Sequence, residues 1–519
     1  MTAYPFDTVA DLLRRGADDA PAIGAPGRPA LTHGGLRALA GRTIAALNAM
    51  GIGRQDRVAI VLPNGPEMAS AFVTIACGAT TAPLNPAYRG EEFDFYLSDL
   101  DAKCLVIQQG MASPARAVAE ARGIPIVELV PAEGPAGDFS LVAPASLAPA
   151  SVAAGRRGAP ARTGAAEADD VALVLHTSGT TSRPKIVPLR HVNVTASAAH
   201  IGANLALEPG DTCLNIMPLF HIHGLIAAVL SSLAAGGSVV CTPGFNAFKF
   251  FATFEEARPS WFTAVPTMHQ AILGLAPRHK PAIAAGRLRF IRSSSASLPP
   301  QVMTAMEEAF GVPVIESYGM TEAAHQMASN PLPPRPHYAG SVGIAAGPEI
   351  AIMADDGTLL PPGALGEVVI RGRNVTAGYE NNADANAKAF IHGWFRTGDQ
   401  GTLDDAGYLR LTGRLKEIIN RGGEKVSPLE VDEVLMDHPA VQQVVTFAMP
   451  HAKLGEEVAA AVVLHEGHAL DEHGLRDFAG TRLAPFKVPR RIVFLAEIPK
   501  GATGKLQRIG LAEKLGLSA

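Results

Sequence analysis

The sequence of 519 residues contains only four cysteines, Cys77, Cys104, Cys213 and Cys241, and no CxxC pair. Their scatter excludes a disulfide framework and a cysteine-rich zinc site, and it is typical of proteins from a reducing compartment. An excess of basic residues is missing as well, because the formal net charge is −5 at pH 7. We therefore expect neither nucleic acid nor an anionic membrane surface among the partners.

Long uninterrupted apolar runs are also absent. Residues 212–248 contain no Asp, Glu, Lys or Arg. A bilayer span needs roughly 20 continuous apolar residues, and prolines, glycines and histidines break this segment into shorter apolar runs. We expect a buried helix followed by a strand at 238–242. Residues 1–16 lack the basic and apolar segments of a secretion signal and predict an amphipathic helix. The final "LGLSA" matches no targeting signal, so the expected location is the cytoplasm.

Short apolar runs alternate with longer helical patterns, which is typical of an α/β fold with largely parallel sheets. The strand-like run 57–65, for example, is followed by helical spacing at 66–79. Because the predicted strands are almost continuously apolar, the sheets should be covered on both faces. The other predicted strands are at 103–107, 125–129, 171–179, 212–218, 238–242, 261–266, 290–296 and 313–319.

Changes in composition divide the chain. Residues 112–170 are rich in Ala, Pro and Gly, and we expect them to include an exposed, irregular connector. After residue 340, short strands joined by turns predict an antiparallel or barrel-like element. We expect a large N-terminal domain at 1–413 and a small α+β C-terminal domain at 414–519, with a hinge at 414–416. A monomer and a homodimer are both compatible with the sequence.

Residues 176–191, "HTSGTTSRPKIVPLRH", are a candidate phosphate-binding loop. A Walker A loop has a Gly directly before its Lys, which opens a helix. Here Pro184 precedes Lys185 and a strand-like run follows, so the loop is predicted to join two strands. Backbone N–H groups near Gly179, hydroxyl groups and the Lys185 charge can hold a polyphosphate, whereas the alternative is a polar turn. The hydroxyl residues are Thr177, Ser178, Thr180, Thr181 and Ser182.

Four further segments follow: "ESYGMTE" at 316–322, "GWFRTGD" at 393–399, "GRLKEIINRGGEK" at 413–425 and "PKGATGKLQR" at 499–508. In this order the five motifs resemble those of the acyl-adenylate-forming, AMP-binding superfamily, in its acyl-CoA synthetase branch. The resemblance runs essentially from end to end. It implies that a carboxylic acid and ATP give acyl-AMP and pyrophosphate, and that the thiol of coenzyme A then displaces AMP. It also implies Mg²⁺ as cofactor and a C-terminal domain that is mobile.

The same resemblance implies roles for individual residues. Lys505 would bridge the acid and the phosphate oxygens during adenylation, and Lys416 would be the pivot of the C-terminal domain. Glu322, together with Thr181, would hold Mg²⁺ on the nucleotide, because a hard cation prefers oxygen ligands.

Other motif residues would bind the nucleotide and coenzyme A. Asp399 would accept hydrogen bonds from the ribose hydroxyls, with Arg414 nearby on ribose or phosphate, and Tyr318 would stack on adenine. Gly422 and Gly423 would allow the narrow pantetheine arm of coenzyme A to approach closely. The implied ATP-binding residues are Thr177, Ser178, Gly179, Thr180, Thr181, Ser182, Lys185, Ser295, Ala296, Ser297, Ser317, Tyr318, Gly319, Met320, Thr321, Asp399 and Arg414.

The acid pocket is expected to be polar, whereas a fatty acid would need an apolar tunnel. The candidate acid-binding residues are His221, Ser294, Ser295 and His325, with His223 as a further candidate. Their hydroxyl and imidazole groups can bind a second carboxylate. The segments "FIRSSSASL" and "MTEAAHQMASNPLP" resemble those of oxalate–CoA ligases, which implies oxalate as the acid. Malonate or another short acid is the alternative.

Two other classes of protein compete with a ligase. A non-catalytic nucleotide sensor is disfavoured because Lys505, Asp399, Arg414 and the other motif residues are all present. A P-loop NTPase would release ADP in place of AMP. Ser182, Ile186 and Gln400 depart from the common family pattern. Ile186 follows Lys185, and a β-branched side chain disfavours positive φ, so we expect a local backbone adjustment there.

Overall fold

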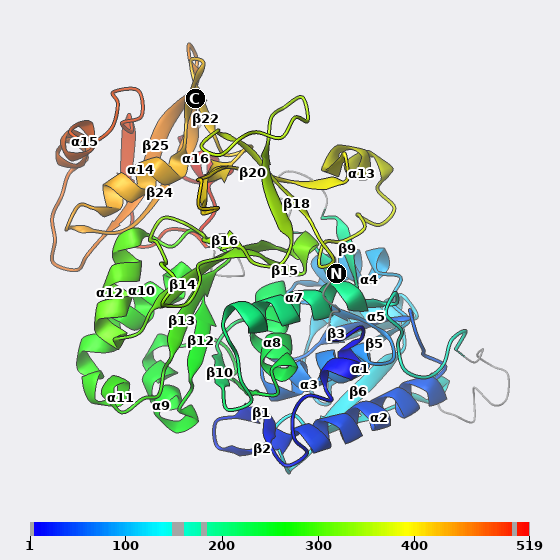
Figure 1. Cartoon of the computed structure of the whole chain (residues 1–519). Coiled ribbons are helices and arrows are strands. Elements are labelled where there is room, and N and C mark those ends of the chain that lie inside the picture. Colours follow the sequence, from blue (N-terminus) through cyan, green and yellow to red (C-terminus); the bar gives the residue numbers. More distant parts are fainter. Residues whose placement is uncertain (1–4, 148–159, 178–183, 501–505, 518–519) are drawn as a thin grey trace.

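The computed structural model describes residues 5–147, 160–177, 184–500 and 506–517, and Figure 1 labels its helices and strands. The described residues form four β-sheets. Two large sheets lie in the lower part of Figure 1, and two five-stranded sheets lie above them. Within the described part of the chain, every helix is too short or too polar to span a bilayer.

The first large sheet has seven strands in the order β7-β6-β5-β3-β4-β8-β9. Its five inner strands are parallel, whereas β7 and β9 are antiparallel to their neighbours. Helices α4 (Gly90–Asp99) and α5 (Pro114–Ala121) pack on its outer face through buried apolar side chains. The strands are β3 (Arg57–Val61), β4 (Thr80–Pro83), β5 (Cys104–Gln108), β6 (Ile126–Pro131), β7 (Phe139–Val142), β8 (Val171–His176) and β9 (Ile186–Arg190).

The second large sheet has nine strands in the order β16-β15-β14-β13-β12-β10-β11-β1-β2, and those from β14 to β1 are parallel. Its outer face is covered by helices whose phenylalanines and methionines form a second core. The strands are β1 (Pro21–Ala25), β2 (Arg28–Thr32), β10 (Thr212–Asn215), β11 (Ser238–Cys241), β12 (Trp261–Ala264), β13 (Phe290–Ser294), β14 (Val314–Met320), β15 (His325–Ser329) and β16 (Ile344–Ala345). The covering helices are α9 (Ala247–Ala257), α10 (Pro266–Leu275), η3 (Ala276–Arg278), α11 (Lys280–Ala284) and α12 (Pro300–Phe310).

The main core lies between the two large sheets, because buried side chains of both sheets and of the intervening helices form one cluster. The apolar segment 212–248 supplies part of this layer as a π-helix, which begins at His223 and continues into α8. The remaining helices of the large sheets' layers are α1 (Val9–Leu12), α2 (His33–Ala49), α3 (Pro66–Ala76), η1 (Ala145–Leu147), α7 (His191–Asn204), η2 (His223–Leu230), α8 (Ser231–Ala234) and η4 (Thr321–Ala323).

The third sheet is antiparallel and the fourth belongs to the C-terminal unit. In Figure 1 the C-terminal unit, in orange and red, lies above α10 and α12. The third sheet and its helix comprise β17 (Glu349–Met353), β18 (Gly366–Arg371), α13 (Ala383–Ala389), β19 (Phe390–Ile391), β20 (Trp394–Leu403) and β21 (Leu409–Arg414). The C-terminal unit comprises β22 (Ile419–Arg421), β23 (Glu424–Val426), α14 (Pro428–Met436), β24 (Val441–His451), β25 (Gly455–Leu464), α15 (Glu472–Gly480), β26 (Arg491–Phe494) and α16 (Leu511–Lys514).

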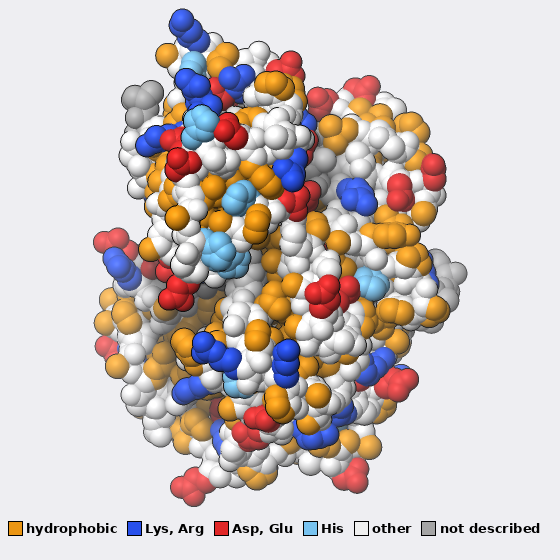
Figure 2. Space-filling model, turned by 90° about the vertical axis from the view of Figure 1, so that its left-hand side faces the viewer, with side chains coloured by type: hydrophobic (Ala, Val, Ile, Leu, Met, Phe, Trp, Pro, Cys, Tyr) orange, Lys and Arg blue, Asp and Glu red, His pale blue; other side chains and the backbone are white. Residues whose placement is uncertain are grey.

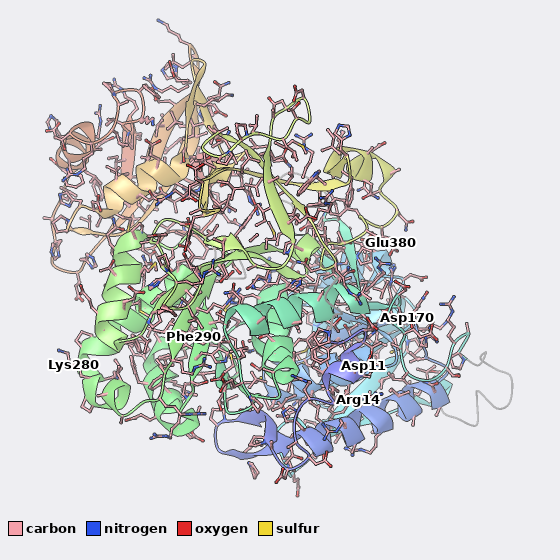
Figure 3. The ribbon with its side chains drawn as sticks, viewed as in Figure 1. Asp11, Arg14, Asp170, Lys280, Phe290 and Glu380 are labelled. Atoms are coloured by element: carbon pink, nitrogen blue, oxygen red, sulfur yellow. The ribbon has the colours of Figure 1, made fainter. Side chains whose placement is uncertain are left out.

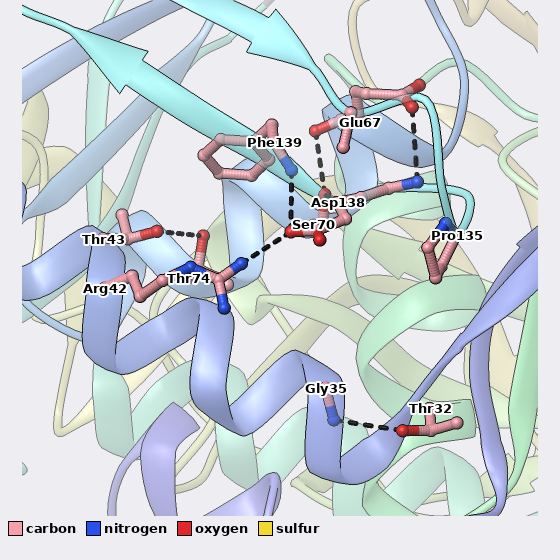
Figure 4. Close-up of polar contacts among 12 residues, drawn as sticks. Thr32, Gly35, Arg42, Thr43, Glu67, Ser70, Thr74, Pro135, Asp138 and Phe139 are labelled. Atoms are coloured by element: carbon pink, nitrogen blue, oxygen red, sulfur yellow. Dashed lines mark hydrogen bonds and ion pairs between the residues drawn. The ribbon is translucent and has the colours of Figure 1, made fainter.

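Polar contacts fix the helices of the central layer (Figure 4). The hydroxyl of Thr32 accepts the backbone N–H of Gly35 at 3.1 Å and caps the N-terminus of α2. Arg42 of α2 donates to the Asp138 carboxylate at 2.6 Å, and Ser70 of α3 donates to the carbonyl of Gly137 at 2.6 Å. These bonds tie both helices to the segment that leads into β7.

The α/β fold, the parallel strands and the antiparallel element after residue 340 are confirmed. The candidate phosphate loop does join two strands, since β8 and β9 pair antiparallel with His176 opposite Ile186. Within residues 112–170, where an irregular connector was expected, the described part contains α5, β6, β7 and η1, and residues 148–159 lie outside the described residues. The amphipathic helix expected at 1–16 is a single turn, α1.

The backbone adjustment expected at Ile186 is wrong. Ile186 lies in a regular strand, its φ is not positive, and its side chain packs in the apolar cluster beneath α4. A β-branched residue favours this extended conformation. The backbone carbonyl of Ile186 accepts a hydrogen bond from the backbone N–H of Glu380 at 3.1 Å. Ile186 therefore connects the phosphate loop to the segment that follows β18.

Asp170, labelled in Figure 3, anchors the start of β8 and with it the strand that leads into the phosphate loop. Its side chain is buried and accepts from Arg54 Nε at 2.6 Å, from Gln55 at 2.8 Å and from the backbone N–H of Glu167 at 2.8 Å. Burial by itself raises the pKa of Asp170, but these donors outweigh it and lower the pKa to about 2.

We expect Asp170→Asn to destabilise the protein by about 2 kcal/mol at neutral pH, because the lowered pKa measures how strongly the fold favours this carboxylate. The contribution is complete above pH ~4 and is lost as the pH falls towards 2, so the melting temperatures of the two proteins should converge in acid. Asp169→Asn is the matched control, because Asp169 pairs with Arg190 in solvent. Equal losses for the two variants would contradict the anchoring role of Asp170.

Candidate active site

The carboxyl ends of parallel strands β13 and β14 form the floor of the candidate site. Their register pairs Ser294 with Ser317, so the residues that follow β13 lie beside the end of β14. In doubly wound sheets such ends are where ligands bind. The predicted residues Ser295, Ala296 and Ser297 follow β13 at this edge, and Tyr318, Gly319 and Met320 end β14 there, followed by Thr321.

Tyr318, Asp399 and Arg414 form one cluster at this edge. The Tyr318 hydroxyl donates to Asp399 Oδ2, and Arg414 Nε lies 3.3 Å from Asp399 Oδ1. Asp399 and Arg414 face each other across the β20–β21 pair. Burial, and then the Asp399 charge, raise the pKa of Tyr318, so it remains a donor and holds the carboxylate in place. The buried carboxylate can accept further hydroxyl groups, as a ribose diol would supply.

Glu322, Tyr379 and Lys185 form a second cluster. The Tyr379 hydroxyl donates to Glu322 Oε1 at 2.8 Å, and Lys185 Nζ lies 4.3 Å from the centre of the Tyr379 ring. Burial raises the pKa of Glu322, and the Tyr379 hydrogen bond opposes that shift. The cluster thus places a carboxylate and an ammonium group beside the phosphate loop.

Two hydrogen bonds between Thr177 and Lys185 hold the two ends of the phosphate loop together. Thr177 N–H donates to the carbonyl of Lys185 at 3.0 Å, and Lys185 N–H donates to the Thr177 hydroxyl at 3.2 Å. Tyr379 is fixed in turn, because its backbone exchanges hydrogen bonds of 2.7 and 2.8 Å with the amide of Asn386 in α13. These contacts set the position of the Lys185 side chain against the Tyr379 ring.

Three of the polar residues expected around the acid meet at the same edge. His223 and His325 stack with ring centres 5.0 Å apart, and His223 Nδ1 lies 2.9 Å from the Ser295 hydroxyl. Ser295 and His325 have positive φ values of 76° and 99°, which is uncommon outside glycine and is typical of functional sites. The Ser294 hydroxyl donates to the carbonyl of Ser317 at 2.9 Å, and His221 lies half-buried beside Phe220.

A cleft separates this edge from the C-terminal unit. Ala296 and Ser297 line one wall, and Leu506 and Arg508 line the other. Arg508 donates to Asp432 at 2.6 Å and lies 3.5 Å from Glu417, which anchors the chain that follows residue 505. Figure 2 shows one face of the molecule, where the upper C-terminal unit meets the large sheets and charged side chains of both signs are scattered.

Other predicted residues do not meet at this cleft. Gly422 and Gly423 are exposed at the turn between β22 and β23, and Lys416 is exposed between β21 and β22. The predictions for Lys505 and for loop residues Ser178, Gly179, Thr180, Thr181 and Ser182 fall outside the described residues.

Sequence reasoning missed two residues of the site, Tyr379 and Arg292. Tyr379 carries no local signal, since its role depends on Glu322 and Lys185 from distant segments. Arg292 was detectable as a charged residue in the predicted apolar strand 290–296. Its side chain is wholly buried and contacts His223 and His325.

Comparison with known protein families identifies the fold's family. A model described as "AMP-binding enzyme" matches residues 13–380, and one described as "AMP-binding enzyme C-terminal domain" matches residues 430–505. The chain belongs to the AMP-binding enzyme family. The resemblance inferred from the five motifs is therefore confirmed for this AMP-binding enzyme.

Individual relatives cover nearly all of the chain. It is 45% identical over 510 residues to an oxalate–CoA ligase of Arabidopsis thaliana, covering 97% of each chain. It is 42% identical to an oxalate–CoA ligase of Saccharomyces cerevisiae, covering 90% of this chain and 88% of that one. The structure of ATP-bound MatB from Rhodopseudomonas palustris is similar with a TM-score of 0.86 and 29% identity, covering 98% of each chain.

Tyr379→Phe removes the hydrogen bond to Glu322 and keeps the ring that Lys185 contacts. We expect kcat/KM for ATP to fall about 10- to 100-fold, since a hydrogen bond to a charged group contributes roughly 1.5–3 kcal/mol. The acid limb of the pH–rate profile should move to higher pH, because the lost bond opposed the burial that raises the pKa of Glu322.

Tyr408→Phe is the control for this experiment, because its hydroxyl donates to the carbonyl of Pro336 at 2.6 Å, away from the Glu322 cluster. An unchanged pH profile in Tyr379→Phe, or an equal effect of Tyr408→Phe, would refute the proposed coupling of Tyr379 to Glu322.

Proposed function

We propose that this AMP-binding enzyme is an ATP-dependent, AMP-forming oxalate–CoA ligase. The observation that carries the proposal is the convergence of two groups of residues at one strand edge. The Tyr318–Asp399–Arg414 cluster suits a nucleotide, and the polar Ser295–His223–His325 group beside it suits a small acid with a second anionic end. The names of two relatives similar over most of their lengths, both oxalate–CoA ligases, support the choice of acid.

The first half-reaction joins two anions. An oxygen of the acid carboxylate attacks the α-phosphate of ATP, and the bond to the β-phosphate breaks, so that pyrophosphate leaves and acyl-AMP remains. Cations must screen this encounter. Lys185 beside the loop and Arg414 beside Asp399 are placed to do so, and we assign the bridging position to Lys505, with Leu506 already on the cleft wall.

The donor set at Glu322 fits a Mg²⁺ ion bound with the nucleotide. Its carboxylate is buried, its second oxygen is not engaged by Tyr379, and a hard cation prefers carboxylate and phosphate oxygens. We propose that Glu322, with Thr181 of the loop, holds Mg²⁺, which supplies charge neutralisation to the phosphates when bound. The protein's own task is to keep Glu322 ionised in a buried position through Tyr379 and Lys185.

The second half-reaction needs a different arrangement of the C-terminal unit. We propose domains at 1–413 and 414–519, with rotation about Lys416 in the hinge 414–416. In the present structure Leu506 and Arg508 face the cleft, whereas Gly422 and Gly423 are exposed away from it. Rotation would exchange the two faces, and the thiolate of coenzyme A would then attack the acyl carbon and release AMP.

The remaining parts of the proposal follow from the sequence. We propose a cytoplasmic enzyme, either a monomer or a homodimer, that uses ATP, a small carboxylic acid and coenzyme A. A ligase for malonate or another short acid is the second candidate, because the same polar group can accept any small acid with two anionic ends.

The choice of acid is tested by ATP–pyrophosphate exchange with oxalate, malonate, acetate, butyrate and benzoate. We expect oxalate to give the highest kcat/KM and to exceed acetate by at least about 100-fold, since a site built for a polar group rejects analogues that lack it. Product analysis should find AMP and pyrophosphate. Faster exchange with butyrate or benzoate would end the oxalate assignment, and ADP as product would end the ligase assignment.

Lys505→Ala separates the two half-reactions. We expect adenylation to fall by at least about 100-fold, because a positive charge at the reacting phosphate is lost, while thioester formation from supplied acyl-adenylate is retained. Lys500→Ala is the control, since Lys500 is a nearby lysine that pairs with Glu497 at 2.9 Å. Equal loss of both half-reactions in Lys505→Ala would refute the bridging role.

A further inference from the structure

Arg292 lies inside the nine-stranded sheet with a wholly buried side chain. No ion pair joins it to a carboxylate in the described part of the chain, and its Nε has no hydrogen-bond partner. Arg54 provides the contrast, because it pairs with the buried carboxylate of Asp170. Burying an unpaired charge is strongly unfavourable, and a well-packed apolar side chain of similar size would normally stabilise such a position better.

Among the described residues, the guanidinium of Arg292 contacts only neutral groups. Nη1 lies 3.4 Å from the Thr263 hydroxyl and 3.5 Å from His223 Nε2. Nη2 lies 3.2 Å from His325 Nε2 and 3.2 Å from Oε1 of the Gln326 side-chain amide. Burial lowers the pKa of Arg292 to about 9, which still leaves the group protonated at neutral pH. The acid site therefore has a positive charge beneath it that the described protein residues do not neutralise.

The direction of the surrounding hydrogen bonds follows from this arginine. A guanidinium can only donate, so Nε2 of His325 must accept, and His325 carries its proton on Nδ1. Arg292 Nη1 also faces His223 Nε2 at 3.5 Å, so this nitrogen accepts as well, and the Thr263 hydroxyl, which lies 2.6 Å from it, is the donor in that contact. His223 consequently also carries its proton on Nδ1.

The same relay ends at the acid site. His223 Nδ1–H donates to the Ser295 hydroxyl oxygen at 2.9 Å, which leaves the hydroxyl hydrogen of Ser295 free to be donated onward. The positive φ of Ser295 holds that hydroxyl at the carboxyl edge of β13, beside Ala296 on the cleft wall. An acid at this edge thus meets a hydrogen-bond donor whose orientation depends on Arg292.

We propose that Arg292 is the positioning residue that selects acids with a second anionic group. Its buried charge attracts that group, and the relay through Thr263 and His223 presents the Ser295 hydroxyl as a donor to it. The substrate class is short acids that carry a carboxylate or sulfonate close to the reacting carboxylate. This inference rests on the proposed ligase reaction, and it does not depend on oxalate being the particular acid.

The first experiment compares oxalate with oxamate, which has a neutral amide in place of the second carboxylate. Exchange rates are measured for wild type, Arg292→Met and Arg292→Lys. We expect Arg292→Met to lower kcat/KM for oxalate about 100-fold, mostly through KM, and for oxamate less than about fivefold. Arg292→Lys should retain part of the preference, because it keeps the charge.

Calorimetric binding of AMP is measured for each variant, and unchanged affinity shows that the nucleotide site is still folded. A structural role alone predicts parallel losses for oxalate and oxamate, and that result would overturn the proposal. A preserved oxalate-to-oxamate ratio in Arg292→Met would overturn it as well.

A matched pair at Thr263 tests the relay without removing the buried charge. Thr263→Val removes the hydroxyl at nearly constant shape, whereas Thr263→Ser keeps it. We expect Val to lower kcat/KM for oxalate about tenfold with AMP affinity unchanged, and Ser to restore most of that loss. Equal activities of the Val and Ser variants would exclude the relay.

The experiment separates this inference from the choice of oxalate. If wild type prefers malonate, the oxalate assignment fails, and the Arg292 variants are then compared on malonate and its half-amide with the same expected loss of preference. If wild type prefers an acid without a second anionic group, the inference about Arg292 is overturned as well.

Discussion

The cost of burying charge constrains every part of this site. Asp399 of β20, Glu322 of η4 and Arg292 of β13 are all buried, and an uncompensated charge is unfavourable in such a position. The two carboxylates are compensated within the protein, Asp399 by Tyr318 and Arg414, and Glu322 by Tyr379 and nearby Lys185. Arg292 meets only neutral acceptors in the described ranges of the chain. Of these three buried charges, the one without an opposite charge beside it is therefore positive, which suits a site for anionic substrates.

The topology makes this concentration of charge attainable. Parallel strands β12, β13 and β14 end at the same edge, so Thr263 lies opposite Arg292, and Ser294 lies opposite Ser317, the residue before Tyr318. The antiparallel β20–β21 pair then brings Asp399 and Arg414 against Tyr318. Polar side chains are concentrated in β13 and β14, and Arg292 and Thr263 are kept from water on the side of the sheet where they contact His223 of η2.

Sequence patterns predicted those features of the structure that depend on neighbouring residues in the chain. The two-strand phosphate loop followed from Pro184 and the strand-like run after Lys185, and the pairing of β8 with β9 agrees. The π-helical form of the segment from His223 and the undistorted backbone at Ile186 were not predicted, because both depend on packing against other segments. The roles of Tyr379 and Arg292 were missed for the same reason, since their partners come from distant strands and loops.

Arg292 lies behind the two histidines, so the residue that carries the positive charge differs from the residue that would donate a hydrogen bond to the acid. A pocket that relied on charged imidazoles would change its affinity for anions near pH 6.5, where histidine ordinarily titrates. Here His223 and His325 accept hydrogen bonds through Nε2, so both are neutral, and the charge resides on a guanidinium that stays protonated at neutral pH. The imidazole rings and Ser295 provide directional hydrogen bonds, while Arg292 provides the positive electrostatic potential that attracts an anion. A small dianionic acid can therefore be recognised with constant charge across the physiological pH range, and the histidines need not change protonation when it binds.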